Sequence, residues 1–187
     1  MLKGFIKQLR PALVSLLILT VICGVLYTAL ITGLGQVIFP SQANGSLITN
    51  TASNGSQQNY GSALLGQNFN TPQYLIGRPM AVSNLSPTST AQAALVQQRI
   101  DWWHQLDPSN SAPIPLELVT ASGSGYDPNI SPEAAEYQVE RIARARNIGT
   151  DEVRSIIQQC TSGRFLGFIG EPVVNVLQVN LALDGLN

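Results

Sequence analysis

Few residues of this chain have the chemistry for catalysis or metal binding. The sequence contains one histidine, His104, and two cysteines, Cys23 and Cys160. Zinc sites are built mainly from three or four His and Cys ligands, so one histidine and the one cysteine outside the apolar N-terminal stretch are too few. A lone histidine beside Trp102 and Trp103 in an amphipathic segment is more typical of packing or of a surface. The sequence therefore predicts no zinc site and no histidine-dependent catalysis.

Three further patterns resemble functional loops but lack residues that those loops need. The Ser-Gly-Ser-Gly run at 122–125 lacks the first glycine of a nucleophile elbow and the third glycine of a dinucleotide loop. The segment 127–131, Asp-Pro-Asn-Ile-Ser, begins like a calcium loop but lacks the glycine and the closing glutamate, and it predicts a turn and a helix cap. The carboxylate pairs at 133/136 and 151/152 fall in predicted first helical turns, where the helix dipole explains them.

A long apolar stretch without any charged residue lies between Arg10 and Pro40. The rest of the chain, which would have to position any functional site, follows this stretch. As a helix, its 20 residues from 12 to 31 would cover roughly 30 Å, the thickness of a bilayer's hydrocarbon core. A cleaved secretory signal is the alternative, and the Ser-Gln-Ala run at 41–43 fits a cleavage site. We favour a retained anchor because a signal's apolar core is only about 7–15 residues long.

The charges around this stretch predict its orientation. Lys3, Lys7 and Arg10 precede it, and the first acid of the chain is Asp101. The positive-inside rule then places the N-terminus in the cytoplasm. We expect a cytoplasmic segment at 1–10, a transmembrane helix at 11–35 and an extracytoplasmic (periplasmic) domain at 36–187.

One face of the predicted membrane helix carries small residues at every fourth position, namely Thr20, Gly24, Thr28 and Thr32. Small residues at this spacing let a second helix approach closely within a bilayer. Such a row also arises by chance, because Gly and Thr are common in membrane helices. We treat it as a candidate helix-packing face.

The composition of the remaining chain excludes several functions. After residue 40 there are seven arginines, eleven acids and no lysine, a net charge of −4. A nucleic-acid surface needs a basic patch, and a P-loop or a Schiff base needs a lysine. Cys160 has no partner on its side of the membrane, so no intrachain disulfide is expected. A domain outside the membrane with no disulfide fits a bacterial envelope.

The outer segment predicts a small α+β domain. We expect a β-hairpin within 41–70 with its tip at 54–56 and apolar flanks at 47–48 and 63–65. Helices are predicted from Ser89 or Thr90 to Asp107, from Ser131 to Gly149 and from a cap at Thr150 to about Cys160. Strands are expected at 116–120 and 173–183, the second because it is rich in β-branched residues.

Several segments together resemble the C subunit (KdpC) of the bacterial potassium-transporting P-type ATPase, the Kdp complex. They cover nearly the whole chain in order: 9–13, 42–47, 61–69, 77–79, 117–125, 127–135, 141–146 and 170–184. Departures from the family pattern are local, since the segment 49–60 is unusually rich in Asn, Ser and Gln and the loop 80–90 is short. Within the matched segments, the polar residues Gln67, Arg78, Asp127 and Asn175 are candidates for contacts with a partner or for holding the fold.

The resemblance implies a non-catalytic accessory subunit of an ATP-driven, high-affinity potassium uptake pump in the bacterial inner membrane. It implies three protein partners, namely a channel-like A subunit, a P-type ATPase B subunit and a small F peptide. The lipid bilayer is a further partner, and no nucleic acid is expected to bind. No cofactor is expected in this chain, because ATP and Mg²⁺ are handled by the B subunit. It also implies a role in assembly and activity, and an outer domain near the outer potassium entrance. The alternative from the residues alone is a free-standing anchored module that binds a small solute or a cell-wall component.

Overall fold

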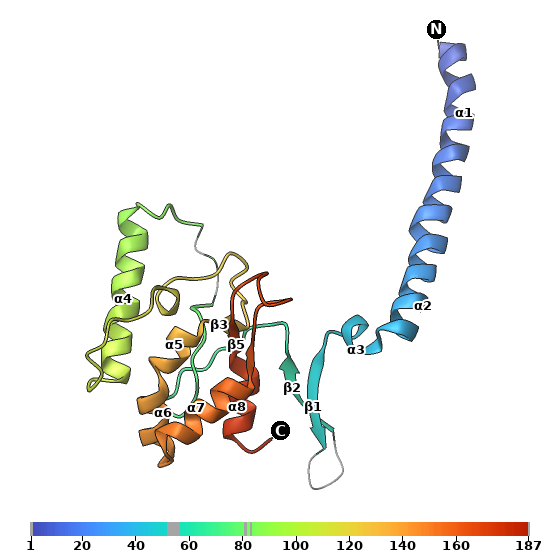
Figure 1. Ribbon diagram of the computed structural model, residues 1–187. Helices are drawn as coiled ribbons and strands as arrows, with labels where there is room; N and C mark the ends of the chain where they lie inside the picture. Colours follow the sequence, from blue (N-terminus) through green and yellow to red (C-terminus); the bar gives the residue numbers. More distant parts are fainter. Residues whose placement is uncertain (1, 52–56, 81, 83, 187) are drawn as a thin grey trace. The chain divides into compact units, whose positions relative to one another are not determined.

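The computed structural model describes residues 2–51, 57–80, 82 and 84–186, and the chain divides into two compact units, Met1–Leu47 and Ile48–Asn187. The first unit is one continuous helix followed by a short turn of helix (Figure 1). Its elements are α1 (Leu2–Leu19), a π-helical stretch η1 (Thr20–Tyr27), α2 (Thr28–Ile38) and α3 (Pro40–Ala43).

The long helix of the first unit is apolar and unpacked. Lys7–Ile38, 32 residues, is the one described helix long and apolar enough to cross a membrane, and none of it is buried within the chain. At about 1.5 Å per residue it extends roughly 48 Å, more than the hydrocarbon core needs. The expected fold class, one N-terminal apolar helix before a small α+β domain, is confirmed.

The second unit combines short strands with five helices in the part that the structure describes. Its elements are β1 (Leu47–Thr51, starting at the last residue of the first unit), β2 (Gln57–Ser62), α4 (Thr90–Leu106), the 3₁₀ turn η2 (Leu116–Leu118), β3 (Asn129–Ile130), α5 (Pro132–Glu136), α6 (Val139–Arg146), α7 (Thr150–Gln159), β4 (Thr161–Ser162), β5 (Val173–Asn175) and α8 (Val176–Leu183). The strands β1 and β2 pair with each other. The other sheet has the order β3-β5-β4 with antiparallel pairs, in which Ile130 and Thr161 both face Val174.

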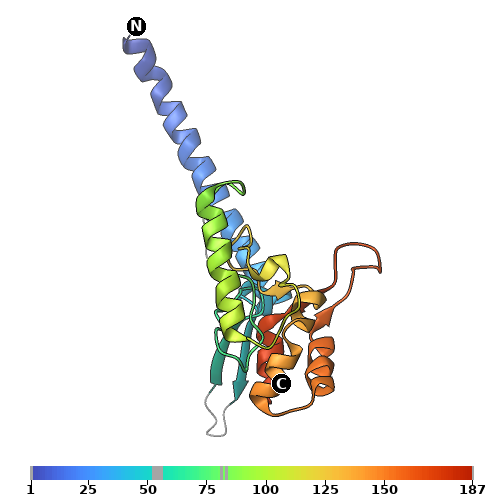
Figure 2. The ribbon, with the colours of Figure 1, turned by 90° about the vertical axis from the view of Figure 1, so that its left-hand side faces the viewer.

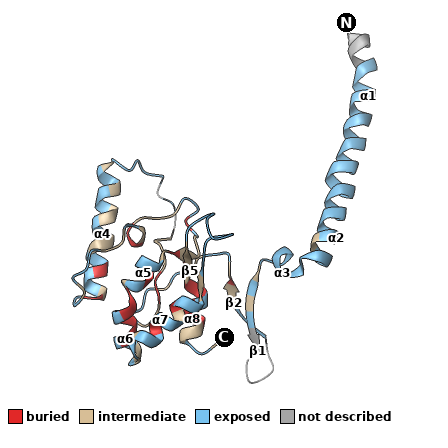
Figure 3. Cartoon of the chain, in the orientation of Figure 1, coloured by how far each residue is buried: buried red, intermediate tan, exposed pale blue. Residues whose placement is uncertain are grey.

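The core lies where the helices α4 to α8 meet the extended segment before α4 (Figures 2 and 3). Fully buried side chains include Leu75, Trp103, Ile142, Val153 and Val179. Burying one such large apolar side chain stabilises a fold by about 1.5–3 kcal/mol. The loop at 163–171, between β4 and β5, stands away from the rest of this unit in Figure 2.

Local signals located α4 correctly. Ser89 caps it by accepting a hydrogen bond from the Gln92 N–H at 3.2 Å, and the helix ends before Asp107. The hairpin is also confirmed as the pair β1 and β2, although 63–65 lies in a turn after β2 rather than within it. The expected tip at 54–56 lies outside the described residues.

The prediction of a final strand over 173–183 is wrong beyond residue 175. The strand β5 ends at Asn175, whose side chain accepts a hydrogen bond from the Gln178 N–H at 3.1 Å and so caps α8. From that cap, Val176, Val179 and Asn180 lie on one helical face and are all buried. The segment forms a helix rather than a strand because the helix buries this face, and that burial outweighs the β propensity of its individual residues.

The predicted strand at 116–120 is also wrong. The segment forms the tight turn η2, in which the Leu118 and Val119 N–H groups donate to the carbonyls of Pro115 and Leu116. The Thr120 hydroxyl adds a bond to the Leu116 carbonyl at 2.9 Å. These local bonds satisfy the backbone where no neighbouring strand is present in the described structure.

The helix expected from 131 to 149 is divided into α5 and α6 at Tyr137 and Gln138. It ends at Arg146, because Asn147 adopts the left-handed conformation of a C-cap. Gly149 instead precedes α7 in the N-cap position, so Thr150 is the first residue of that helix rather than its cap.

Candidate functional site

An extended segment at 67–80 runs between α4 and the helices α6 and α8, and buried amide side chains hold it there. The Leu75 backbone donates to Asn180 Oδ1 at 2.7 Å and accepts from Asn180 Nδ2 at 2.9 Å. Gln138 does the same for Ile76, with both distances at 2.9 Å. Each amide thus takes the place of a neighbouring strand.

Arg141 completes this arrangement from α6. Its guanidinium donates to the Pro72 and Tyr74 carbonyls and to Gln138 Oε1. It also lies 5.7 Å from the centre of the Trp103 ring. Burial lowers the pKa of Arg141 to about 10. The segment is therefore held by a buried cation that is bound to carbonyl oxygens rather than to a carboxylate.

Arg146 fastens the same segment to the end of α8. It donates to the Gln73 carbonyl at 2.7 Å and the Leu183 carbonyl at 2.6 Å, and it pairs with Asp184 at 2.7 Å. The Tyr74 hydroxyl donates to the same carboxylate at 3.0 Å. This hydrogen bond, together with burial, raises the pKa of Tyr74.

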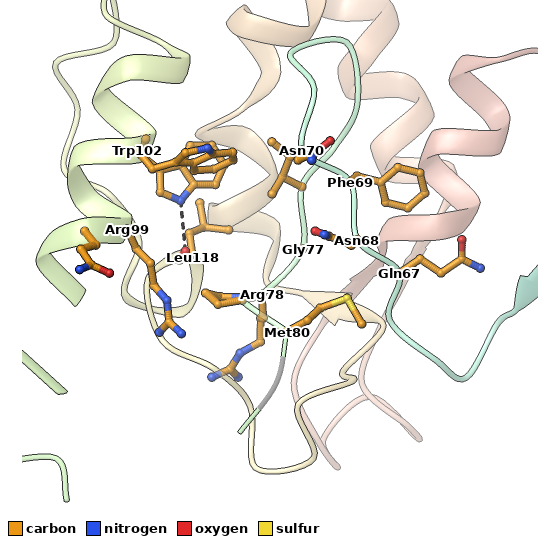
Figure 4. Close-up of a pocket in the computed structure, with 14 residues that line it drawn as sticks. Gln67, Asn68, Phe69, Asn70, Gly77, Arg78, Met80, Arg99, Trp102 and Leu118 are labelled. Carbon is orange, nitrogen blue, oxygen red and sulfur yellow. Dashed lines mark hydrogen bonds between the residues drawn. The ribbon is translucent and has the colours of Figure 1, made fainter. Parts of the chain in front are cut away.

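A half-open cavity of about 280 Å³ lies between this segment and α4 (Figure 4). Its walls are mainly apolar and aromatic, with amides and two guanidinium groups among them. The lining residues are Gln67, Asn68, Phe69, Asn70, Ile76, Gly77, Arg78, Pro79, Met80, Gln98, Arg99, Trp102, Trp103 and Leu118. The Trp103 indole N–H donates to the Leu118 carbonyl at 3.1 Å, and this hydrogen bond joins two of the lining residues.

The described lining of the cavity contains no His, Cys, Ser, Asp, Glu or Lys side chain. Among the described lining residues, only Arg78 and Arg99 are ionisable. Arg99 donates to the Val119 carbonyl at 2.8 Å, and burial lowers its pKa. An arginine is a fixed cation and a hydrogen-bond donor, not a general base. The described lining therefore offers apolar surface, amide groups and two cations for binding or packing.

Two of the four predicted polar residues, Gln67 and Arg78, line this cavity, and Asp127 lies beside Arg78. Arg78 donates to the Ala121 carbonyl at 3.1 Å and lies 4.0 Å from the Asp127 carboxylate. Gln67 donates to the Tyr60 carbonyl at 2.8 Å, beside Gly61, where any β-carbon would collide with the Gln67 amide. These contacts join segments of this chain to one another.

The fourth residue, Asn175, lies at the junction of β5 and α8. Its amide donates to the Ala63 carbonyl at 2.9 Å, while its oxygen caps α8. It thus ties the turn after β2 to the three-stranded sheet. Contact of any of the four residues with a partner stays a prediction.

The residues that only partly matched catalytic or metal motifs have structural contacts. Asp127 accepts a hydrogen bond from the Asn129 N–H at 3.0 Å, as expected for a turn. Ser131 caps α5 through the Ala134 N–H and also donates to Glu117. His104 is exposed on α4. Within residues 2–51, 57–80, 82 and 84–186, no group of three His, Cys, Asp or Glu side chains could hold a metal.

Comparison with known proteins assigns the chain to a family. The sequence-family model of KdpC, described as the c chain of the K⁺-transporting ATPase, matches residues 9–185. The chain belongs to the KdpC family. It is 53% identical to the potassium-transporting ATPase KdpC subunit of Listeria welshimeri over 99% of both chains. It is also 47% identical to the protein of that name from Methylococcus capsulatus, over 97% of this chain and 99% of the relative.

The small-residue row of this KdpC chain lies on the π-helical stretch and the start of α2. The Thr20 methyl group lies 3.9 Å from where a β-carbon on Gly24 would be, so these positions are neighbours. The Thr28 hydroxyl donates to the Cys23 carbonyl at 3.3 Å, a fifth-residue contact that fits a π-helix. Packing of this face, Thr32 included, against another helix stays a prediction.

One surface of this KdpC chain was missed by sequence reasoning. The loop between β4 and β5 exposes four large apolar side chains: Phe165, Leu166, Phe168 and Ile169. The signal was present in the sequence as an apolar run between Arg164 and Glu171, but it resembles an ordinary buried strand. Only the structure shows that nothing within the described chain covers it.

Proposed function

We propose that this chain is a non-catalytic accessory subunit of an ATP-driven, high-affinity potassium uptake pump, and that the pump needs it for assembly and activity. The observation that carries the proposal is the match of residues 9–185 to the family of c chains of the K⁺-transporting ATPase. The cavity of the second unit supports the non-catalytic part of the proposal, because its ionisable lining residues are two arginines bound to backbone carbonyls.

The proposed topology follows from the charges around the long helix. Lys3, Lys7 and Arg10 would be cytoplasmic, the helix would cross the inner membrane, and the second unit would be extracytoplasmic. The chain would bind the channel-like A subunit, the P-type B subunit and the F peptide. The B subunit would handle ATP and Mg²⁺, and the second unit of this chain would lie near the outer potassium entrance.

The direct test is to express the pump with and without this chain and to measure potassium-stimulated ATPase activity of the purified complex. We expect the activity to be lost without the chain, and also when residues 41–187 are deleted while the helix is kept. Full activity of the complex lacking the chain would contradict a required role. Full activity with the helix alone would contradict a role for the second unit.

The alternative function, an anchored module that binds a small solute or a cell-wall component, has the cavity in its favour. Ligand pockets are typically about 300–1,000 Å³, and this cavity of about 280 Å³ lies just below that range. Purification of the full chain from its native membrane in mild detergent separates the two functions. Recovery with ATPase subunits supports the subunit, whereas recovery with only a solute or glycan supports the module.

A further inference from the structure

The loop between β4 and β5, residues 163–171, presents an unusual concentration of exposed apolar surface, and we refer to it as the 163–171 tip. The side chains of Phe165, Leu166 and Phe168 are 69%, 70% and 72% exposed, and Ile169 is 50% exposed. Single exposed apolar residues are common, but a contiguous group of this kind marks an interaction surface.

The tip is an ordered hairpin in the structure. Phe165 and Ile169 exchange two backbone hydrogen bonds, at 2.8 and 2.9 Å, and the Phe168 N–H donates to the Phe165 carbonyl at 3.3 Å. At its base, Arg164 and Glu171 form an ion pair at 2.7 Å. The apolar side chains are therefore held in place before any partner is bound, which lowers the entropic cost of binding.

The turn at the tip holds Leu166 in a backbone conformation that is unfavourable for leucine. Leu166 has a φ of +53°, in the left-handed region, and Gly167 follows with +82°. A turn with two positive φ angles prefers Asn-Gly, and a bulky residue with positive φ is an outlier. Local folding therefore does not explain Leu166. Strained positions of this kind cluster at functional sites.

The charges favour a protein partner over a lipid surface. Surfaces that bind anionic bilayers combine apolar side chains such as Trp, Phe and Leu with Lys or Arg toward the headgroups. The tip has the apolar side chains, but its one arginine is paired with Glu171, and the chain after residue 40 has a net charge of −4. Protein interfaces, by contrast, use aromatic anchors in a core depleted of charge.

We propose that the 163–171 tip is the anchor by which the second unit docks into an apolar recess on another subunit of the K⁺-transporting ATPase. This rests on the proposed function, because it names the surface by which the chain joins that complex. The recess would accept the two phenyl groups and Leu166, and the ion pair at the base of the hairpin would lie at its polar rim.

The test is to replace Leu166→Asn in the full chain and to measure how much of the other ATPase subunits it recovers from detergent extracts. Asparagine suits the left-handed turn, so the thermal midpoint of the purified chain should be unchanged or higher. Recovery of the ATPase subunits should fall about tenfold or more. Phe168→Ser should give the same loss. Leu116→Asn is the control, because Leu116 is 72% exposed but lies outside the tip.

Each outcome decides between the proposals. Normal recovery by Leu166→Asn and Phe168→Ser would overturn the tip as an anchor while leaving the proposed function intact. Failure of the wild-type chain to recover any ATPase subunit would overturn both. A photoreactive phenylalanine at position 168 should form an adduct with a protein subunit in the membrane, and an adduct with lipid alone would overturn the choice of a protein partner.

Discussion

Asn180 and Gln138 give the extended segment before α4 the hydrogen bonds that a neighbouring strand would supply. Each amide binds both the N–H and the carbonyl of one buried residue, Leu75 or Ile76. The wall of the cavity therefore depends on two side chains far from it in sequence. At the residue scale, these polar side chains stabilise the fold, whereas the apolar side chains at 165–169 remain exposed.

Replacing Asn180→Leu should lower the free energy of unfolding by about 2–4 kcal/mol. The leucine has the same branched outline as asparagine, with somewhat larger groups, but leaves the Leu75 N–H and carbonyl buried without partners, and each such group costs about 1–3 kcal/mol. Urea unfolding of the full chain in detergent, followed by tryptophan fluorescence, measures the change. Gln178→Leu on the exposed face of α8 is the control and should change stability by less than about 0.5 kcal/mol. Equal effects of the two variants would contradict the role of Asn180.

Cys160 should react slowly with alkylating reagents in the folded chain. Burial raises the pKa of its thiol above the ordinary 9.0, so less of the reactive thiolate is present at pH 8.5. In a Cys23→Ser background, iodoacetamide labelling followed by mass spectrometry should be several-fold slower than in urea. Because the fold favours the neutral thiol, stability should also fall as the pH rises through the unfolded thiol pKa. Labelling at equal rates in both states would rule this out.

At the scale of elements, the long apolar helix carries the row of small residues for which we predict packing against another helix. A β-carbon at Gly24 would meet only the Thr20 methyl group, at 3.9 Å, so larger residues fit the isolated helix. Loss of function on enlarging this face would therefore report on a partner rather than on the helix itself.

The double change Gly24→Leu and Thr28→Leu should lower the amount of the other ATPase subunits that the chain recovers. The two leucines would keep a neighbouring helix from approaching closely, which is how helices associate within lipid. Co-purification from detergent extracts measures the effect. Ala29→Leu, about 100° around the helix, is the matched control and should leave recovery unchanged. Normal recovery by the double variant would remove the packing face from consideration.

The sequence predicted those elements whose ends are set by local contacts. α4 begins at the Ser89 cap, and α5 begins at Ser131 and Pro132, as expected from cap chemistry alone. The break between α5 and α6 could not be predicted, because Gln138 is held there by bonds to Ile76, 62 residues away. The helix α8 was missed because a short apolar run has no unambiguous period, and burial of Val179 and Asn180 decides it.

The same distinction applies to the candidate site. The polar residues Gln67, Arg78 and Asp127 were found from their segments, but the cavity beside them was not. It depends on α4 lying against the segment 67–80, a long-range contact that no local pattern encodes. The exposure of the 163–171 tip could not be predicted either, because apolar residues in sequence are ordinarily expected to be buried.

At the scale of the whole molecule, all of the buried core belongs to the second unit within the described residues. Its members run from Leu75 to Leu181, and the long helix adds none. The division between the two units falls after Leu47, and just before it the chain turns at 44–46, where Gly45 and Ser46 have φ values of +88° and +49°. A protease site placed at this turn should therefore separate the long helix from all of the buried core that the structure describes.

Cleavage at residues 44–46 should release a second unit that stays folded. Since no buried residue is lost, the thermal midpoint by circular dichroism should stay within about 2 °C of the full chain, a change of well under 1 kcal/mol for a domain of this size.

The same cut made in the assembled pump tests whether the helix is needed to attach the second unit to the complex. If the second unit stays bound by its own surface, as the 163–171 tip predicts, potassium-stimulated activity should survive the cut. Release of the unit from the complex together with loss of activity would instead show that the helix supplies the attachment.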